Sequence, residues 1–180
     1  HRYYVHGAID PMGLLRAIVQ NATDEEGEVQ GGSTLTQQYV KNMLVQAALE
    51  SEDPAERAAA IEAARTAEGT AGYARKLAEA KMAIALEQRL SKEEILERYL
   101  NISQFGKSVY GVEAAAQYFF SVPASQLNYL QAATIAGITR APSLYDPQVN
   151  PVESEGRRNI VLRAMRDNGY ITETQYQEGR

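Results

Sequence analysis

The residues best suited to chemistry lie in one short stretch, 31–42, which holds two glycines, several hydroxyl and amide side chains, and one lysine. Its glycines allow the backbone to turn sharply, and Thr34 and Gln37 have the spacing of a capping box, so we expect a helix to begin at Ser33 or Thr34. Helical spacing then places three polar side chains on one stripe: Thr34, Gln38 and Lys41. Free N–H groups, hydroxyls and an ammonium favour the binding of a phosphate-like anion at this helix start. The same residues would also serve as an ordinary loop and helix cap.

Further charged candidates lie later in the chain. Arg75 and Glu79 are four residues apart, so they are neighbours on the surface of a helix. On spacing alone, they could form an exposed ion pair worth roughly a few tenths of a kcal/mol. Arg140 directly follows a nearly all-apolar stretch, and Pro142 and Pro147 stiffen the segment that carries it.

Helix caps and helical spacing of apolar residues occur along the chain, and no stretch shows the alternation of apolar and polar residues that is typical of a strand. The sequence therefore predicts a mostly α protein. Asp10 and Pro11 predict a helix over 10–20. We expect four of its residues to be buried: Met12, Leu15, Ile18 and Val19. Residues 73–90 are expected to form an amphipathic helix, and its apolar band contains Leu77, Ala80, Met82, Ile84 and Leu86.

The remaining helices are marked mainly by their caps. Ser91 and Glu94 form a second capping box, and the helix that follows runs to about Asn101. Later helices are predicted over 112–120, over 126–138 as the central one, over 150–168 with Gly169 at its end, and from Thr172 onward. Residues 46–72 are rich in alanine, glutamate and arginine; we expect a helix from Asp53 and Pro54 to the glycines at 69–72, exposed or mobile, in an inserted segment.

Composition narrows the class of protein. The 180 residues suffice for one domain with a substantial core, and the lack of cysteine excludes disulfides and thiolate metal sites. A net charge of −5 argues against a general nucleic-acid binder, so a bound anion must be met by locally gathered cations. No apolar run reaches the roughly 18 residues of a membrane span.

Four stretches resemble, in order, the second to fifth motifs of the peptidoglycan glycosyltransferases, which are the lipid II polymerising domains of class A penicillin-binding proteins and the monofunctional transglycosylases. They are residues 31–42, 75–79, 92–101 and 140–147. The resemblance implies a single glycosyltransferase domain over residues 1–180. Its expected fold is lysozyme-like and mostly α, with two lobes around a central groove.

The family's first motif is matched by its aromatic residue and its histidine, here Tyr3 and His6, while Ala8 stands where the family has glycine. That motif starts with a Glu-Asp pair, which would lie immediately before His1. We therefore expect the true N-terminus to be missing from this chain, together with the glutamate that the family uses as catalytic base. For His6, a hydrogen bond to a neighbouring loop is the expected role.

The resemblance implies a reaction that joins the 4-hydroxyl of lipid II to the anomeric carbon of a growing glycan chain, inverts that carbon and releases undecaprenyl pyrophosphate. Such a reaction needs a base for the hydroxyl and positive charge for the leaving pyrophosphate. The residues expected to bind phosphate oxygens are Lys41, Arg75, Lys76 and Arg140. Those expected to bind sugar or phosphate oxygens are Ser33, Thr34, Gln38 and Asn42. Glu79 is similar to the family's second catalytic glutamate; among cations it should stay ionised and stabilise charge, with or without a divalent cation such as Mg²⁺.

The implied partners are lipid II, the growing glycan chain and the membrane surface. The implied location is the extracytoplasmic face of the bacterial plasma membrane, with an anchoring helix upstream and a possible transpeptidase domain downstream of this chain. Two other functions stay open. A lytic muramidase shares the fold, but its leaving group is a sugar and needs no gathered cations; a non-catalytic scaffold for cell-wall assembly is the other.

Overall fold

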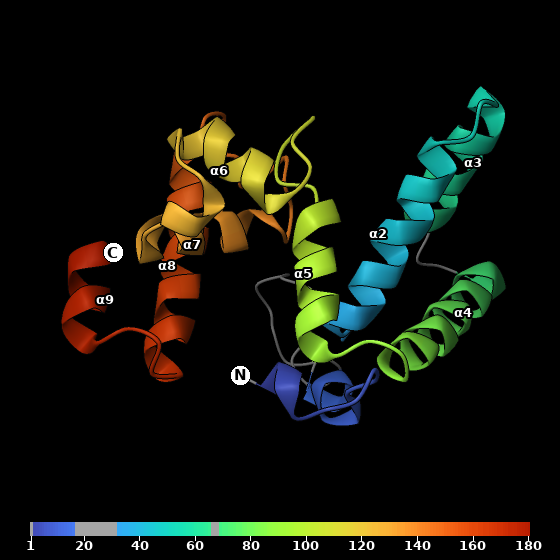
Figure 1. Ribbon diagram of the computed structural model, residues 1–180, viewed down its shortest axis with the longest axis horizontal. Helices are drawn as coiled ribbons and strands as arrows, with labels where there is room; N and C mark the ends of the chain where they lie inside the picture. The colour runs from blue at the N-terminus through green and yellow to red at the C-terminus, as the bar shows by residue number, and fades with distance from the viewer. Residues whose placement is uncertain (1, 17–31, 66–68) are drawn as a thin grey trace. The chain divides into compact units, whose positions relative to one another are not determined.

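The computed structural model describes residues 2–16, 32–65 and 69–180 (Figure 1). The chain divides into two compact units, His1–Tyr99 and Leu100–Arg180. In the described residues all regular structure is helical, apart from one isolated bridge between Gln104 and Tyr110. The prediction of a mostly α protein is therefore confirmed. None of the described helices combines the length and the apolar character that crossing a membrane requires.

The first unit is organised around α2. Its elements are η1 (Arg2–Tyr4), a helical turn at 11–16, α2 (Leu35–Leu49), α3 (Pro54–Arg65), α4 (Gly69–Glu87) and the start of α5 (Lys92–Ile102). Helix α2 packs against both α3 and α4 (Figure 1). Its start is the predicted capping box, because Gln37 N donates to Thr34 Oγ1 (3.2 Å) and Thr34 N donates to the Gln37 side chain (3.0 Å). The core between these elements is small, with Ala8, Val40 and Ala83 buried together.

The second unit contains α6 (Val112–Phe120), η2 (Ala124–Gln126), α7 (Tyr129–Ile138), α8 (Pro151–Asp167) and α9 (Glu173–Gly179). Helix α7 packs against α8 and α6. It supplies Ile135 and Ile138 to one apolar cluster and Ala133 to a second, so the prediction that it is the central helix is confirmed within this unit. The helix begins later than predicted, because Asn128 provides its N-cap and residues 124–126 form a separate 3-10 turn.

Two predictions about buried faces are wrong. In the turn at 11–16, Met12 and Leu15 are 59 % and 55 % exposed, while Ile18 and Val19 lie outside the described residues. On α4, Leu77 and Ile84 are exposed as well. The apolar residues of α4 are spread around the helix, so periodicity alone did not determine which side packs. The side that is buried instead carries Gly72, Glu79 and Ala83, at helical spacings of seven and four residues.

The segment 46–72 also differs from its prediction. Helix α3 begins at Pro54 as expected and its described side chains are mostly exposed. Gly69 to Gly72 do not end that helix; they form the first turn of α4. That this segment is mobile, or inserted, stays a prediction.

Candidate functional site

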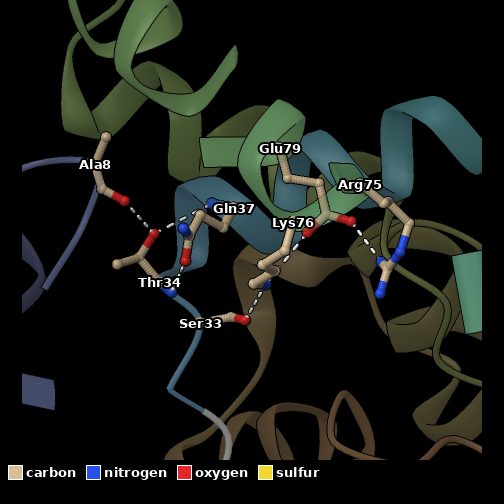
Figure 2. Close-up of polar contacts among 7 residues, drawn as sticks. All are labelled: Ala8, Ser33, Thr34, Gln37, Arg75, Lys76 and Glu79. Atoms are coloured by element: carbon tan, nitrogen blue, oxygen red, sulfur yellow. Dashed lines mark hydrogen bonds and ion pairs between the residues drawn. The ribbon is translucent and has the colours of Figure 1, made fainter. Parts of the chain in front are cut away.

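Glu79 is the centre of a charged cluster on α4. The residue is 1 % exposed, and both of its carboxylate oxygens accept hydrogen bonds from cations (Figure 2). Arg75 Nη1 donates to Oε1 at 2.6 Å, and Lys76 Nζ donates to Oε2 at 3.2 Å. A buried carboxylate is costly unless it is paired and hydrogen-bonded. The pair of Arg75 and Glu79 is therefore not the exposed surface ion pair that spacing alone would allow.

A second contact joins this cluster to the start of α2. Lys76 Nζ donates to Ser33 Oγ at 2.5 Å, although the two residues are 43 positions apart (Figure 2). Ser33 directly precedes the N-cap of α2. The glycine-containing stretch and the charged stretch on α4, which the sequence presents as separate candidates, thus meet in the first unit.

Lys41 belongs to the same electrostatic environment. It lies on α2, seven residues after Thr34; the residue as a whole is exposed, while its ammonium group is partly buried. Burial of the ammonium lowers the pKa of Lys41, and the positive charges of Arg75 and Lys76 act in the same direction, against the charge of Glu79. Helix α2 packs against α4, and the three charged residues that act on the pKa of Lys41 all lie on α4. We call Lys41, Arg75, Lys76 and Glu79 the cation cluster.

The polar side chains predicted to bind substrate occupy different environments. Thr34 is buried; its hydroxyl donates to the Ala8 carbonyl (2.7 Å) and caps α2, so it is used inside the protein. Gln38 is exposed one turn later, and its Oε1 accepts from the Tyr99 hydroxyl at 3.3 Å. Asn42, a further turn along, is half-buried. The same helix therefore presents Gln38, Lys41 and Asn42 beyond a capped first turn.

Arg140 lies in the second unit. It is exposed, two residues after the end of α7, and its backbone N–H donates to the Gly137 carbonyl at 3.4 Å. Its participation with the cation cluster in one site stays a prediction.

Sequence reasoning missed a second polar group, which we call the Glu87 group: Tyr3, Thr36, Glu87 and Lys92. Thr36 Oγ1 and Lys92 Nζ both donate to Glu87 Oε1, at 2.5 and 2.6 Å. The Tyr3 hydroxyl donates to the Lys92 carbonyl at 2.9 Å, across 89 positions of sequence. The only available signals were the match of Tyr3 to the first motif and of Lys92 to the fourth, and neither indicated a contact.

The described residues do not fit a metal held by the protein alone. No group of three or more His, Cys, Asp or Glu side chains gathers in the described part of the chain. Within the cation cluster, both oxygens of the Glu79 carboxylate accept from cations. A magnesium ion there would need most of its ligands from substrate phosphates and water.

Comparison with known proteins agrees with the motifs. The transglycosylase family model matches residues 1–166. Penicillin-binding protein 1A/1B of Bacillus subtilis strain 168 is 39 % identical over 180 residues, covering 99 % of this chain and 17 % of the relative. Penicillin-binding protein 1A of Aquifex aeolicus strain VF5 is 38 % identical over 177 residues, with 98 % and 21 % covered. Penicillin-binding protein 1A of Escherichia coli strain K12 is 37 % identical over 179 residues, with 99 % and 18 % covered.

The chain thus spans about a fifth of the length of the curated relatives it matches. The family match extends from the first-motif residues through the fifth motif, and the lysozyme-like, mostly α fold expected from the resemblance agrees with it. The chain belongs to the transglycosylase family, the peptidoglycan glycosyltransferases that its motifs resemble.

Proposed function

We propose that this domain polymerises lipid II. It joins the 4-hydroxyl of an incoming lipid II to the anomeric carbon of a growing glycan chain, inverts that carbon and releases undecaprenyl pyrophosphate. The observation that carries the proposal, beside family membership, is the cation cluster organised by the buried Glu79.

The charge of the cluster suits the leaving group. Lys41, Arg75 and Lys76 bring three positive charges and Glu79 one negative charge, which leaves a net charge of two positive. A pyrophosphate esterified at both ends carries one negative charge on each phosphate, and departure leaves more charge on the outgoing oxygen. Fixed cations aimed at that developing charge lower the barrier to departure.

Each residue has a distinct part in this proposal. Arg75 offers its planar guanidinium to phosphate oxygens, while Lys41 and Lys76 act as point charges. Glu79 does not transfer a proton; it holds Arg75 and Lys76 in place before substrate arrives. Because these hydrogen bonds exist before substrate binds, the two cations do not have to reorganise during the reaction.

Further polar residues are assigned to substrate binding. Ser33, Gln38 and Asn42 hydrogen-bond sugar or phosphate oxygens, and Thr34 contributes by capping α2 rather than by direct contact. Arg140 supplies a further cation from the fifth motif. We assign the general base to the first-motif glutamate that the family resemblance places before His1.

The setting follows from the substrate. Lipid II is anchored in a membrane, so the domain works at the membrane surface, on the extracytoplasmic face of the bacterial plasma membrane. An upstream helix anchors the protein there, and a transpeptidase domain in the complete protein would account for the greater length of the relatives. A divalent cation, if used, would be bound chiefly by the substrate's phosphates.

The test is a polymerisation assay with purified lipid II and the complete gene product. The wild type should produce glycan strands that separate as a ladder on a gel. Lys76→Met should lower kcat/KM by about 10-fold to 100-fold, since hydrogen bonds to charged groups contribute about 1.5–3 kcal/mol. Lys81→Met is the matched control, because Lys81 is exposed on the same helix but is not part of the cluster.

Two results would contradict the proposal. One is a wild-type protein that forms no glycan strands from lipid II. The other is release of soluble muropeptides from finished peptidoglycan, which would indicate a lytic enzyme instead.

A further inference from the structure

The Glu87 group joins three helices to the N-terminal segment of the first unit. Thr36 lies in the first turn of α2, Glu87 is the last residue of α4 and Lys92 the first residue of α5. Glu87 is eight residues from Glu79, or roughly 12 Å of helical rise, so this group is separate from the cation cluster. Nothing in the proposed chemistry uses it directly.

Three side chains of the Glu87 group are largely shielded from solvent. Thr36 is fully buried, and the side chains of Glu87 and Lys92 are only 14 % and 18 % exposed. An ion pair removed from water to this extent is weak support for stability, because desolvation offsets most of its attraction. Its role is to fix geometry. Glu87 Oε1 accepts hydrogen bonds from Thr36 of α2 and from Lys92 of α5 at the same time, so it fixes the position of α2 relative to the start of α5.

Tyr3 extends this arrangement to the N-terminal segment. Its hydroxyl donates to the Lys92 carbonyl, and the Lys92 ammonium lies 4.8 Å from the centre of its ring. Burial and then the charge of Glu87 raise the pKa of Tyr3 to about 12, so the phenol keeps the proton that it donates at neutral pH.

Residues 2–10 are therefore held at two points. Tyr3 is bound at the start of α5, and the Ala8 carbonyl accepts from Thr34, the N-cap of α2 (Figure 2). Thr34 is adjacent to Ser33, which accepts from Lys76 of the cation cluster. The adjacent residues Ser33 and Thr34 thus connect the N-terminal segment to the residues proposed to hold the diphosphate.

We propose that Glu87 and Lys92 are positioning residues, which act through Thr36 and Tyr3 to set residues 2–10 against the cation cluster. This inference rests on the proposed glycosyltransferase function, in which the first-motif segment carries the base. Misplacing a catalytic group by about 1 Å can cost on the order of 100-fold in rate. Because Arg75 and Lys76 keep their hydrogen bonds to Glu79 when the Glu87 group is lost, that loss should lower kcat and leave KM for lipid II unchanged.

The experiment uses Lys92→Met and Tyr3→Phe in the complete gene product. Lys92→Met should lower kcat at least tenfold with KM within twofold of wild type, and Tyr3→Phe, which removes one hydroxyl and leaves the ion pair intact, should lower it about threefold or more. The single variants Glu87→Gln and Lys92→Met are compared with the double variant that combines them. Because the two residues act as a unit, the double variant should have a kcat no lower than that of the slower single variant. Ser91→Ala is the control: it removes the cap of α5, where Glu94 N donates to Ser91 Oγ at 3.2 Å, and leaves the Glu87 group intact.

A second readout does not depend on activity. Amide hydrogen exchange in residues 3–10 should become at least tenfold faster in Lys92→Met and in Tyr3→Phe, with exchange in α8 unchanged. If wild type makes no glycan strands, the proposed function fails, while exchange still tests the attachment of this segment. Unchanged exchange and unchanged kcat in both variants would overturn the inference, as would a rise in KM at constant kcat or an equal loss of kcat in Ser91→Ala.

Discussion

Lys41→Met should have opposite effects on stability and on activity. The substitution removes the ammonium and keeps a side chain of similar length. In the unliganded protein the charge of Lys41 is unfavourable, because its ammonium is partly buried and lies in the field of the cations Arg75 and Lys76, and the pKa of Lys41 is lowered as a result. Removing that charge should therefore stabilise the free domain, whereas the bound diphosphate loses a cation.

The size of the stability effect depends on pH. Below its lowered pKa, Lys41 is protonated in the folded and the unfolded chain, so the folded state bears the full unfavourable interaction. Above the ordinary value of 10.5 the amine is neutral in both states and the interaction is absent. The advantage of methionine is thus complete at neutral pH and disappears as pH rises through the lowered pKa toward the ordinary one.

The expected magnitudes differ enough to separate the two effects. Lys41 is exposed, so solvent screening limits the gain in unfolding free energy to about 0.5 kcal/mol, or roughly 1–2 °C in Tm. A charge-assisted hydrogen bond to phosphate contributes about 2 kcal/mol, so kcat/KM should fall by about 30-fold.

Thermal unfolding of the complete gene product at pH 7.5 and pH 10, followed for the unfolding of this domain, measures the stability effect, and lipid II kinetics on the same preparations measure the effect on activity. Lys81→Met is the control for the loss of one lysine charge from the surface. A Lys41→Met variant with a lower Tm and wild-type kcat/KM would refute the reasoning, because Lys41 would then be a stabilising residue without a part in binding.

Two further predictions concern Glu79 and Tyr3. Glu79→Gln should reduce polymerisation more than tenfold, because Arg75 and Lys76 lose the carboxylate that holds them; near-normal turnover would reduce Glu79 to a structural ion pair. Tyr3→Phe should remove the tyrosine that titrates near pH 12 in an absorbance titration. Because the folded pKa of Tyr3 is raised from 10.0, its contribution to stability is complete below pH 10 and is lost as pH rises toward 12; equal alkaline stability of wild type and Tyr3→Phe would contradict this.

Helix boundaries could be predicted where the signal lies within one turn. The capping boxes at Thr34 and Ser91 open α2 and α5, and Pro151 starts α8 as expected. Gly169, with φ of 76°, ends α8 in the left-handed conformation that glycine adopts without strain. These helix starts and ends depend on groups only three or four residues away. They can therefore be predicted from the sequence without knowing what each helix packs against.

The buried side of a helix could not be predicted where apolar residues are spread around it. Leu77 and Ile84 of α4 are exposed, and Gly72 and Ala83 are buried. Small residues allow another helix to approach closely, and the buried side of α4 also carries Glu79. A rule that places the largest apolar side chains inside therefore selects the wrong side of α4.

By itself, the sequence determined the family, the helical class and the identities of the charged residues, because motifs and spacings are properties of neighbouring positions. Only the tertiary structure decided that Glu79 is buried, that Lys76 reaches Ser33, and that Tyr3 binds at the start of α5. Burial and contacts across 43 or 89 positions exist only after helices have packed. Packing also gives a charged residue its environment, since the same glutamate on an isolated helix would be an ordinary exposed anion.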